Sequence, residues 1–184
     1  MRRGHWVSAL VVALCVLLSV AVGGWLGWRS ATVDPPAPPA VCPLIRSEVL
    51  DRLVPGHGTP EAAEQNESAM RSNYCWVKSM SGTQAPRTSL WVSLGRYGRY
   101  EGRGPRCLDR GGLQPASNRR NQPFALGDRA LYYLSGDSET GRRIHFSVCL
   151  GTHGVLVDYE AAGVTDPVVV ESAATVAQEV LSWL

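Results

Sequence analysis

A run of 22 residues without a charged side chain, 7–28, is the feature that most constrains this chain of 184 residues. A helix needs about 20 apolar residues to cross the hydrocarbon core of a bilayer, so the run is long enough to span a membrane. Arg2 and Arg3 precede the run, and Arg29 alone follows closely. The positive-inside rule then places residues 1–6 in the cytoplasm. The sequence therefore predicts a single-pass anchor in the cell membrane, with the C-terminal domain extracytoplasmic.

A cleaved signal peptide is the alternative to an uncleaved anchor. Ala21-Val22-Gly23 loosely matches a small-x-small cleavage site, but the apolar run continues to Trp28, beyond the roughly 7–15 residues that a signal peptide needs. Lipidation of Cys15 is disfavoured, because Leu14 rather than a small residue precedes it.

Small residues recur every four positions along this segment. Such stripes let two membrane helices approach closely, although small residues are also common in membrane helices that do not pair. The pattern predicts helix pairing in a homodimer through Cys15, Ser19, Gly23 and Gly27.

The charge of the remaining chain argues against a nucleic-acid binder. The protein has 18 basic and 16 acidic residues, and three of the basic residues flank the apolar run. The part beyond the run is therefore slightly acidic, whereas nucleic-acid-binding domains are usually basic.

Residues 29–41 are rich in proline and predict an extended, semi-rigid linker to a domain at 42–184. Four cysteines in an oxidising compartment most simply form two disulfides. Structural zinc sites pair ligands two to four residues apart, which these cysteines do not, so no metal is expected. The four are Cys42, Cys75, Cys107 and Cys149.

The hydrophobic pattern of this domain predicts helices at both of its ends. Ile45, Val49 and Leu53 form a helical stripe that Pro55-Gly56 ends, and 59–72 predicts a second, weakly amphipathic helix. Asp166-Pro167 opens a closing helix whose apolar stripe is Val169, Ala173, Val176 and Val180.

Alternation of apolar and polar residues predicts about five strands between these helices, at 74–80, 88–95, 129–135, 142–150 and 154–161. Short turns between them favour antiparallel neighbours. We therefore expect an α+β fold, with an antiparallel sheet covered on one face by the N- and C-terminal helices, two disulfides, and one preceding transmembrane helix.

The strand pattern also favours one disulfide connectivity of the three that are possible. Ile144, Phe146 and Val148 face inward, so Cys149 lies on the opposite face of its strand. A disulfide there would fix a loop across the outer side of the sheet, and the loop with Cys107 is the natural partner. Cys42–Cys75 is then the second pair.

Five short motifs follow one another along the chain: "VCPLIRSEVLDRL", "YCWV", "LWVSLG", "ALGDRALYY" and the closing "VVVESAATVAQEVLSWL". Together they resemble small extracytoplasmic domains of actinobacterial cell envelopes. Many such domains are anchored lipoproteins of unknown function, and similar architecture occurs in sensor domains of membrane Ser/Thr kinases. This chain departs from them at Ala40-Val41, where they have Asp-Pro, and in having an apolar anchor in place of a lipid. The resemblance implies an extracytoplasmic binding or sensor-like domain.

An arginine- and glycine-rich segment, 95–123, is the most unusual part of the domain. Guanidinium groups suit phosphate and carboxylate recognition, so the segment predicts docking to headgroups, anionic wall polymers or acidic partner proteins. A solvated loop tethered at Cys107 is the alternative. The candidate anion- or partner-binding residues are Arg96, Arg99, Arg103, Arg106, Arg119 and Arg120.

No catalytic motif is present in the sequence, and we expect neither an enzyme nor a cofactor. His145 and His153 could approach Asp158 across a hairpin to bind a metal, but exposed strand histidines are commoner. Trp76 and Trp91 are interpreted as packing residues rather than as platforms for a ligand.

The sequence as a whole predicts a membrane-anchored, non-catalytic binding or sensor-like domain of the bacterial cell envelope. The alternative is a structural or assembly subunit of a membrane complex. Such a subunit would act through the Arg/Gly-rich loop and the small-residue stripe.

Overall fold

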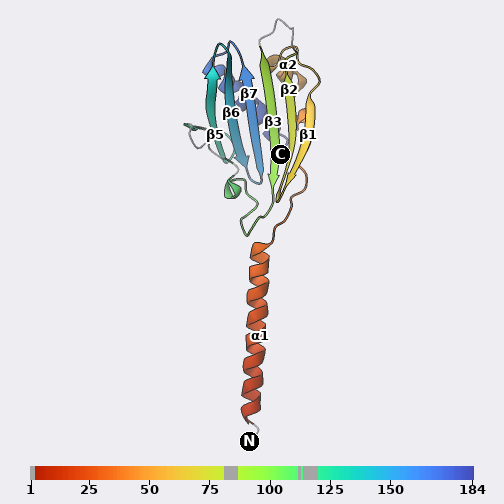
Figure 1. The fold of residues 1–184 in the computed structure, drawn as a ribbon, viewed down its shortest axis with the longest axis vertical. Helices are drawn as coiled ribbons and strands as arrows, with labels where there is room; N and C mark the ends of the chain where they lie inside the picture. The colour runs from red at the N-terminus through yellow and green to blue at the C-terminus, as the bar shows by residue number, and fades with distance from the viewer. Residues whose placement is uncertain (1–2, 81–86, 112, 114–119) are drawn as a thin grey trace.

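The computed structural model describes residues 3–80, 87–111, 113 and 120–184, and its described part contains a sheet of seven strands rather than the expected five (Figure 1). The strands lie in the order β1-β2-β3-β7-β6-β5-β4, and all neighbours are antiparallel. Their bounds are β1 Glu61–Glu67, β2 Met70–Lys78, β3 Thr88–Tyr97, β4 Gln122–Phe124, β5 Arg129–Asp137, β6 Gly141–Leu150 and β7 His153–Ala161.

Two helices cover one face of this sheet, as predicted. In Figure 1 the strands face the viewer, and α2 and α3 lie behind them. The helices are α1 Arg3–Ser30, α2 Ser47–Leu53 and α3 Asp166–Leu181, with short 3-10 turns η1 Cys42–Leu44 and η2 Leu108–Arg110. The fold is therefore α+β.

The core lies between the sheet and these two helices. In β6 the inward side chains Ile144, Phe146 and Val148 are at most 1% exposed, and the apolar stripe of α3 is buried against them. Burial of one such side chain stabilises a fold by about 1.5–3 kcal/mol. The alternation and the helical stripe thus predicted the core correctly.

The helix predicted at 59–72 is wrong. These residues form β1, the turn after it and the start of β2, and β1 is exposed along its whole length. Ala69 adopts a φ of 58° in the turn, and its N–H donates to Asp34 Oδ1 at 3.0 Å. Alanine and glutamate are good helix formers, but helix propensity is a small preference per residue, and pairing with β2 overrides it. Glutamates on an exposed edge strand also discourage pairing with other chains.

The proline-rich linker lies along the domain and is bound to it at several residues. Asn73, which is 7% exposed, donates from Nδ2 to the carbonyl oxygens of Pro38 at 2.7 Å and Pro39 at 3.1 Å. Val33 and Arg99 form an isolated antiparallel bridge, in which the Val33 N–H donates to the Arg99 carbonyl at 2.9 Å. These contacts fix the direction in which the chain leaves α1.

Both predicted disulfides form, Cys42–Cys75 and Cys107–Cys149. The second fixes its loop across the outer side of the sheet, as expected. A Cβ at Gly154 would lie 3.0 Å from the Tyr97 ring and 3.3 Å from Cys107 Sγ, so the loop approaches the strand closely at a glycine. The loop therefore covers the end of the sheet near α1.

Helix α1 is longer than the predicted segment 7–28 and stands apart from the sheet (Figure 1). Its described apolar side chains are exposed, with Leu17 at 67% and Val20 at 68%. Among the residues whose side chains the structure describes, no helix is both long and apolar enough to cross a membrane.

Candidate functional site

The face of the sheet opposite α2 and α3, here called the outer face, carries a line of aromatic and charged side chains. Strand register places these residues side by side across five strands: Trp76 of β2, Trp91 of β3, Asp158 of β7, His145 of β6 and Tyr133 of β5. Trp76 is 39% exposed, and the other four are half-buried. Helices α2 and α3 pack on the other face, so they leave this line uncovered (Figure 1).

A hollow of about 320 Å³ lies next to the two indoles. Ser89 of β3 has Lys78 and Glu160 as its register partners. Its small side chain leaves space between the tryptophans and the charged groups of β6 and β7. The hollow, here called the Trp hollow, is lined by Trp76, Ser89, Trp91, Arg143, Asp158 and Glu160.

Two of the charged groups of the Trp hollow, Arg143 and Asp158, are held in position by their neighbours. Asp158 accepts a hydrogen bond from Arg143 Nη2 at 3.0 Å, and its other carboxylate oxygen lies 2.5 Å from His145 Nδ1. The ring of Tyr133 stacks on His145 with 4.4 Å between centroids. Asp158 is therefore oriented from two sides. Glu160 has neither an ion pair nor a side-chain hydrogen bond within the described residues.

The indoles are positioned by their own neighbours. Tyr74 packs against Trp91 with 5.2 Å between ring centroids, and Lys78 Nζ lies 4.7 Å from the Trp76 ring centroid. Aromatic pairs of this kind contribute about 0.5–1.5 kcal/mol beyond their buried area. The neighbours limit the rotation of both indoles, so the outer face presents ordered ring surfaces.

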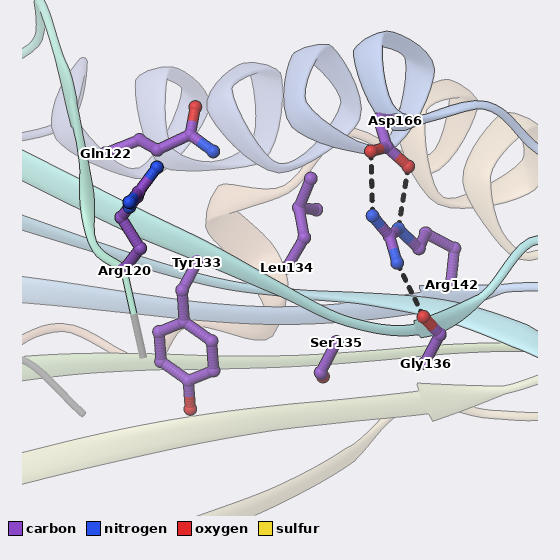
Figure 2. Close-up of a pocket in the computed structure, with 8 residues that line it drawn as sticks. All are labelled: Arg120, Gln122, Tyr133, Leu134, Ser135, Gly136, Arg142 and Asp166. Carbon is purple, nitrogen blue, oxygen red and sulfur yellow. Dashed lines mark hydrogen bonds and ion pairs between the residues drawn. The ribbon is translucent and has the colours of Figure 1, made fainter. Parts of the chain in front are cut away.

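A second hollow, of about 550 Å³, lies at the edge of β5 (Figure 2). Arg142 donates from Nε and Nη2 to the Asp166 carboxylate at 2.7 Å each, and from Nη1 to the Gly136 carbonyl at 2.5 Å. This arginine ties the first residue of α3 to the β5–β6 hairpin. Since its charge is satisfied within the protein, we assign the pair to stability rather than to ligand binding.

The five candidate arginines within the described residues are not gathered into one site. Arg96 lies in β3 and Arg120 just before β4, and three strands separate these two in the sheet. Arg99 bridges to Val33, whereas Arg103 and Arg106 are exposed in the loop after β3. The remaining candidate, Arg119, lies outside the described residues.

The small-residue stripe lies on the exposed surface of α1. The hydroxyl of Ser19 donates to the Cys15 carbonyl at 2.8 Å, and Cys15 is a free, exposed thiol. A Cβ added at Gly23 or Gly27 would meet nothing within 4 Å. A second helix could therefore approach this surface, and pairing stays a prediction.

The two strand histidines lie at different levels of the β6–β7 hairpin, His145 near the middle of β6 and His153 next to the turn. His145 is the register partner of Asp158, whereas His153 is opposite Leu150 and next to Arg96 of β3. Within the described part of the chain, no three His, Cys, Asp or Glu side chains are grouped so as to hold a metal ion. The hairpin register brings His145 against Asp158 but keeps His153 away from both.

The sequence alone does not single out the outer face as a candidate site. It favours packing over ligand binding for Trp76 and Trp91, and the structure places both on the helix-free face. The sequence contains the information for this placement, because each tryptophan alternates with residues that are buried in the core, such as Val77, Leu90 and Val92. What could not be read from the chain was which tryptophan, serine and carboxylate would become neighbours.

Comparison with protein-family models, curated proteins and solved structures finds no match to this chain. The site is therefore interpreted from its own geometry.

Proposed function

We propose that this protein is a membrane-anchored, extracytoplasmic binding domain of the bacterial cell envelope that acts without catalysis. The observation that carries the proposal is the outer face, where ordered aromatic rings and fixed charges are accessible beside a hollow. Binding sites commonly combine aromatic walls with a few placed polar groups. Tryptophan, tyrosine and arginine are also the residues that contribute most to binding energy at interfaces.

The anchor is supported by the uncharged run 7–28 and by the arginines that flank it. Exposed apolar side chains on α1, such as Leu14 at 60% and Leu18 at 57%, would be costly in water and favourable in lipid. The two disulfides suit an oxidising compartment outside the cytoplasm. Together these features favour an extracytoplasmic location for the domain.

A second candidate function is assembly of a membrane complex through the Arg/Gly-rich loop. The observation that favours it is the Val33–Arg99 bridge, which ties this loop to the chain leaving α1. The exposed Arg103 and Arg106 would then face headgroups or a neighbouring membrane protein. An arginine fork makes paired hydrogen bonds with phosphate or carboxylate groups.

One experiment separates the two functions. A photo-reactive amino acid replaces Leu156 on the outer face, Leu108 in the loop, or Val168 on α3 as control, three side chains of similar exposure at 38%, 42% and 48%. Each full-length variant is irradiated in cells, and the products are identified by mass spectrometry. We expect a defined product from Leu156 and none from Val168.

A defined protein product from Leu108 with none from Leu156 would support the assembly function instead. Equal products from all three positions, or no product from any, would contradict both functions.

A further inference from the structure

We propose that the Trp hollow binds a hexopyranose ring of an envelope glycan; this inference rests on the proposed function and names its ligand class. A pyranose has an apolar C–H face and an edge of hydroxyl groups that both donate and accept hydrogen bonds. A site for it needs an aromatic surface next to donors and acceptors in fixed positions. The Trp hollow provides all three.

The aromatic surface comes from two adjacent strands. Trp76 and Trp91 are register partners, and Ser89, two residues before Trp91, opens the space beside them. A volume of about 320 Å³ accommodates one sugar ring, near the lower end of known ligand pockets. A glycan chain could continue along the exposed outer face in either direction.

The polar groups suit hydroxyls better than other ligands. Asp158 is held by Arg143 and His145 and has remaining lone pairs, while Glu160 is an acceptor without a side-chain partner in the described part of the chain. Arg143 has further N–H donors beyond the one bound to Asp158. The hollow thus offers acceptors and donors beside the two indoles.

The charge of the hollow argues against two other ligand classes. Two carboxylates face one guanidinium among the lining residues, so a phosphate or a carboxylate ligand would be repelled. A lipid chain would leave Glu160 and Asp158 desolvated without compensation. A polyhydroxylated ring replaces water at these groups with hydrogen bonds of the same kind.

The test is sedimentation of the full-length protein, purified in detergent micelles, with two insoluble glycans. Peptidoglycan sacculi present N-acetylated amino sugars, and insoluble α-glucan presents glucose. We expect saturable binding to one of the two, which also identifies the source of the sugar. Binding to neither, under conditions where both disulfides are intact, would overturn the inference.

Variants then locate the binding to the Trp hollow. Trp91→Ala should weaken binding about tenfold, the size of effect typical for one principal contact. Trp91→Tyr retains a ring and should keep most of the affinity, whereas Trp91→Leu, which keeps apolar volume, should not. Trp183→Ala removes a tryptophan that is 64% exposed at the end of α3 and is the matched control.

The contribution of the Glu160 carboxylate to binding is tested in the same way. Glu160→Gln should weaken binding several-fold, and Glu171→Gln on the exposed surface of α3 should not. Equal loss in Trp91→Ala and Trp183→Ala would overturn the inference. If neither glycan binds but Leu156 still gives a defined cross-linked product, the ligand class is wrong and the proposed function stands.

Discussion

At the scale of single residues, the surroundings of His153 predict that the stability of the fold depends on pH. It begins β7, is half-buried, and has Arg96 of β3 as its register partner. Burial and the charge of Arg96 both disfavour the imidazolium and lower the pKa of His153 below its ordinary value of 6.5. The folded chain therefore releases this proton at a lower pH than the unfolded chain does.

This linkage gives a prediction with a defined sign. The stability contributed by neutral His153 is complete above the unfolded pKa of 6.5 and is lost as the pH falls toward the lower folded pKa. We expect the free energy of unfolding, measured with urea, to fall as the pH is lowered below this value. His153→Gln should reduce that slope.

An unchanged slope in His153→Gln would show that other groups cause the pH dependence. Asp137 does not contribute to this slope. Hydrogen bonds from Thr140 hold the pKa of its carboxyl below 3.8, so its protonation changes the free energy of unfolding only at lower pH.

At the scale of elements, the linker is the segment whose position most affects the molecule. It is connected to the domain at Val33, which bridges to Arg99, and at Pro38 and Pro39, which accept hydrogen bonds from Asn73. A buried amide left without these partners would cost about 1–3 kcal/mol. Helix α1 and the sheet are thus joined by a packed segment.

Gly98 permits the first of these connections. A Cβ there would lie 1.9 Å from the Val33 carbonyl oxygen and 2.9 Å from Pro35 Cδ. Gly98→Ala should therefore break the Val33–Arg99 bridge and release the linker, while the sheet keeps its core. The expected result is faster amide exchange at Val33 and faster proteolysis within 31–41.

Gly58→Ala is the matched control, because the nearest atom to its new Cβ is 4.0 Å away. Equal protection of Val33 in both variants would show that the bridge does not hold the linker.

At the scale of the whole molecule, helix α1 lies at one end with its described apolar side chains exposed, and the sheet lies at the other end with one face free of helices (Figure 1). A membrane would cover the first, and the proposed ligand the second. Contiguous exposed apolar surface commonly marks a membrane or binding site. The two surfaces therefore suggest one function, in which α1 holds the outer face at the membrane exterior.

The anchor predicts a specific topology. In intact cells, a membrane-impermeant maleimide should label Val168→Cys on the exposed surface of α3 but should not label Cys15 of the unmodified chain. The purified protein should retain Cys15 and resist extraction by alkaline carbonate. Recovery of a mature chain that lacks residues 1–23, or its release by carbonate, would contradict an uncleaved anchor.

The sequence by itself determined those features that depend on local periodicity. The alternation in β3, β6 and β7 placed Leu90, Ile144 and Val157 in the core, and the stripe in α3 identified the face that packs on the sheet. Cys149 was placed on the outer side by the same alternation, which led to both disulfide pairs. Neighbouring residues along the chain are sufficient for such inferences, because side-chain direction follows from backbone geometry.

Only the tertiary structure decided the features that depend on pairing between distant segments. Strand β1 exists because Glu61–Glu67 can pair with β2, although its composition favours a helix. The linker is docked because Asn73 and Gly98 meet it from elsewhere in the chain. The Trp hollow needs Trp76, Ser89 and Glu160 on three adjacent strands, and strand order and register, which set these neighbours, are fixed by long-range packing.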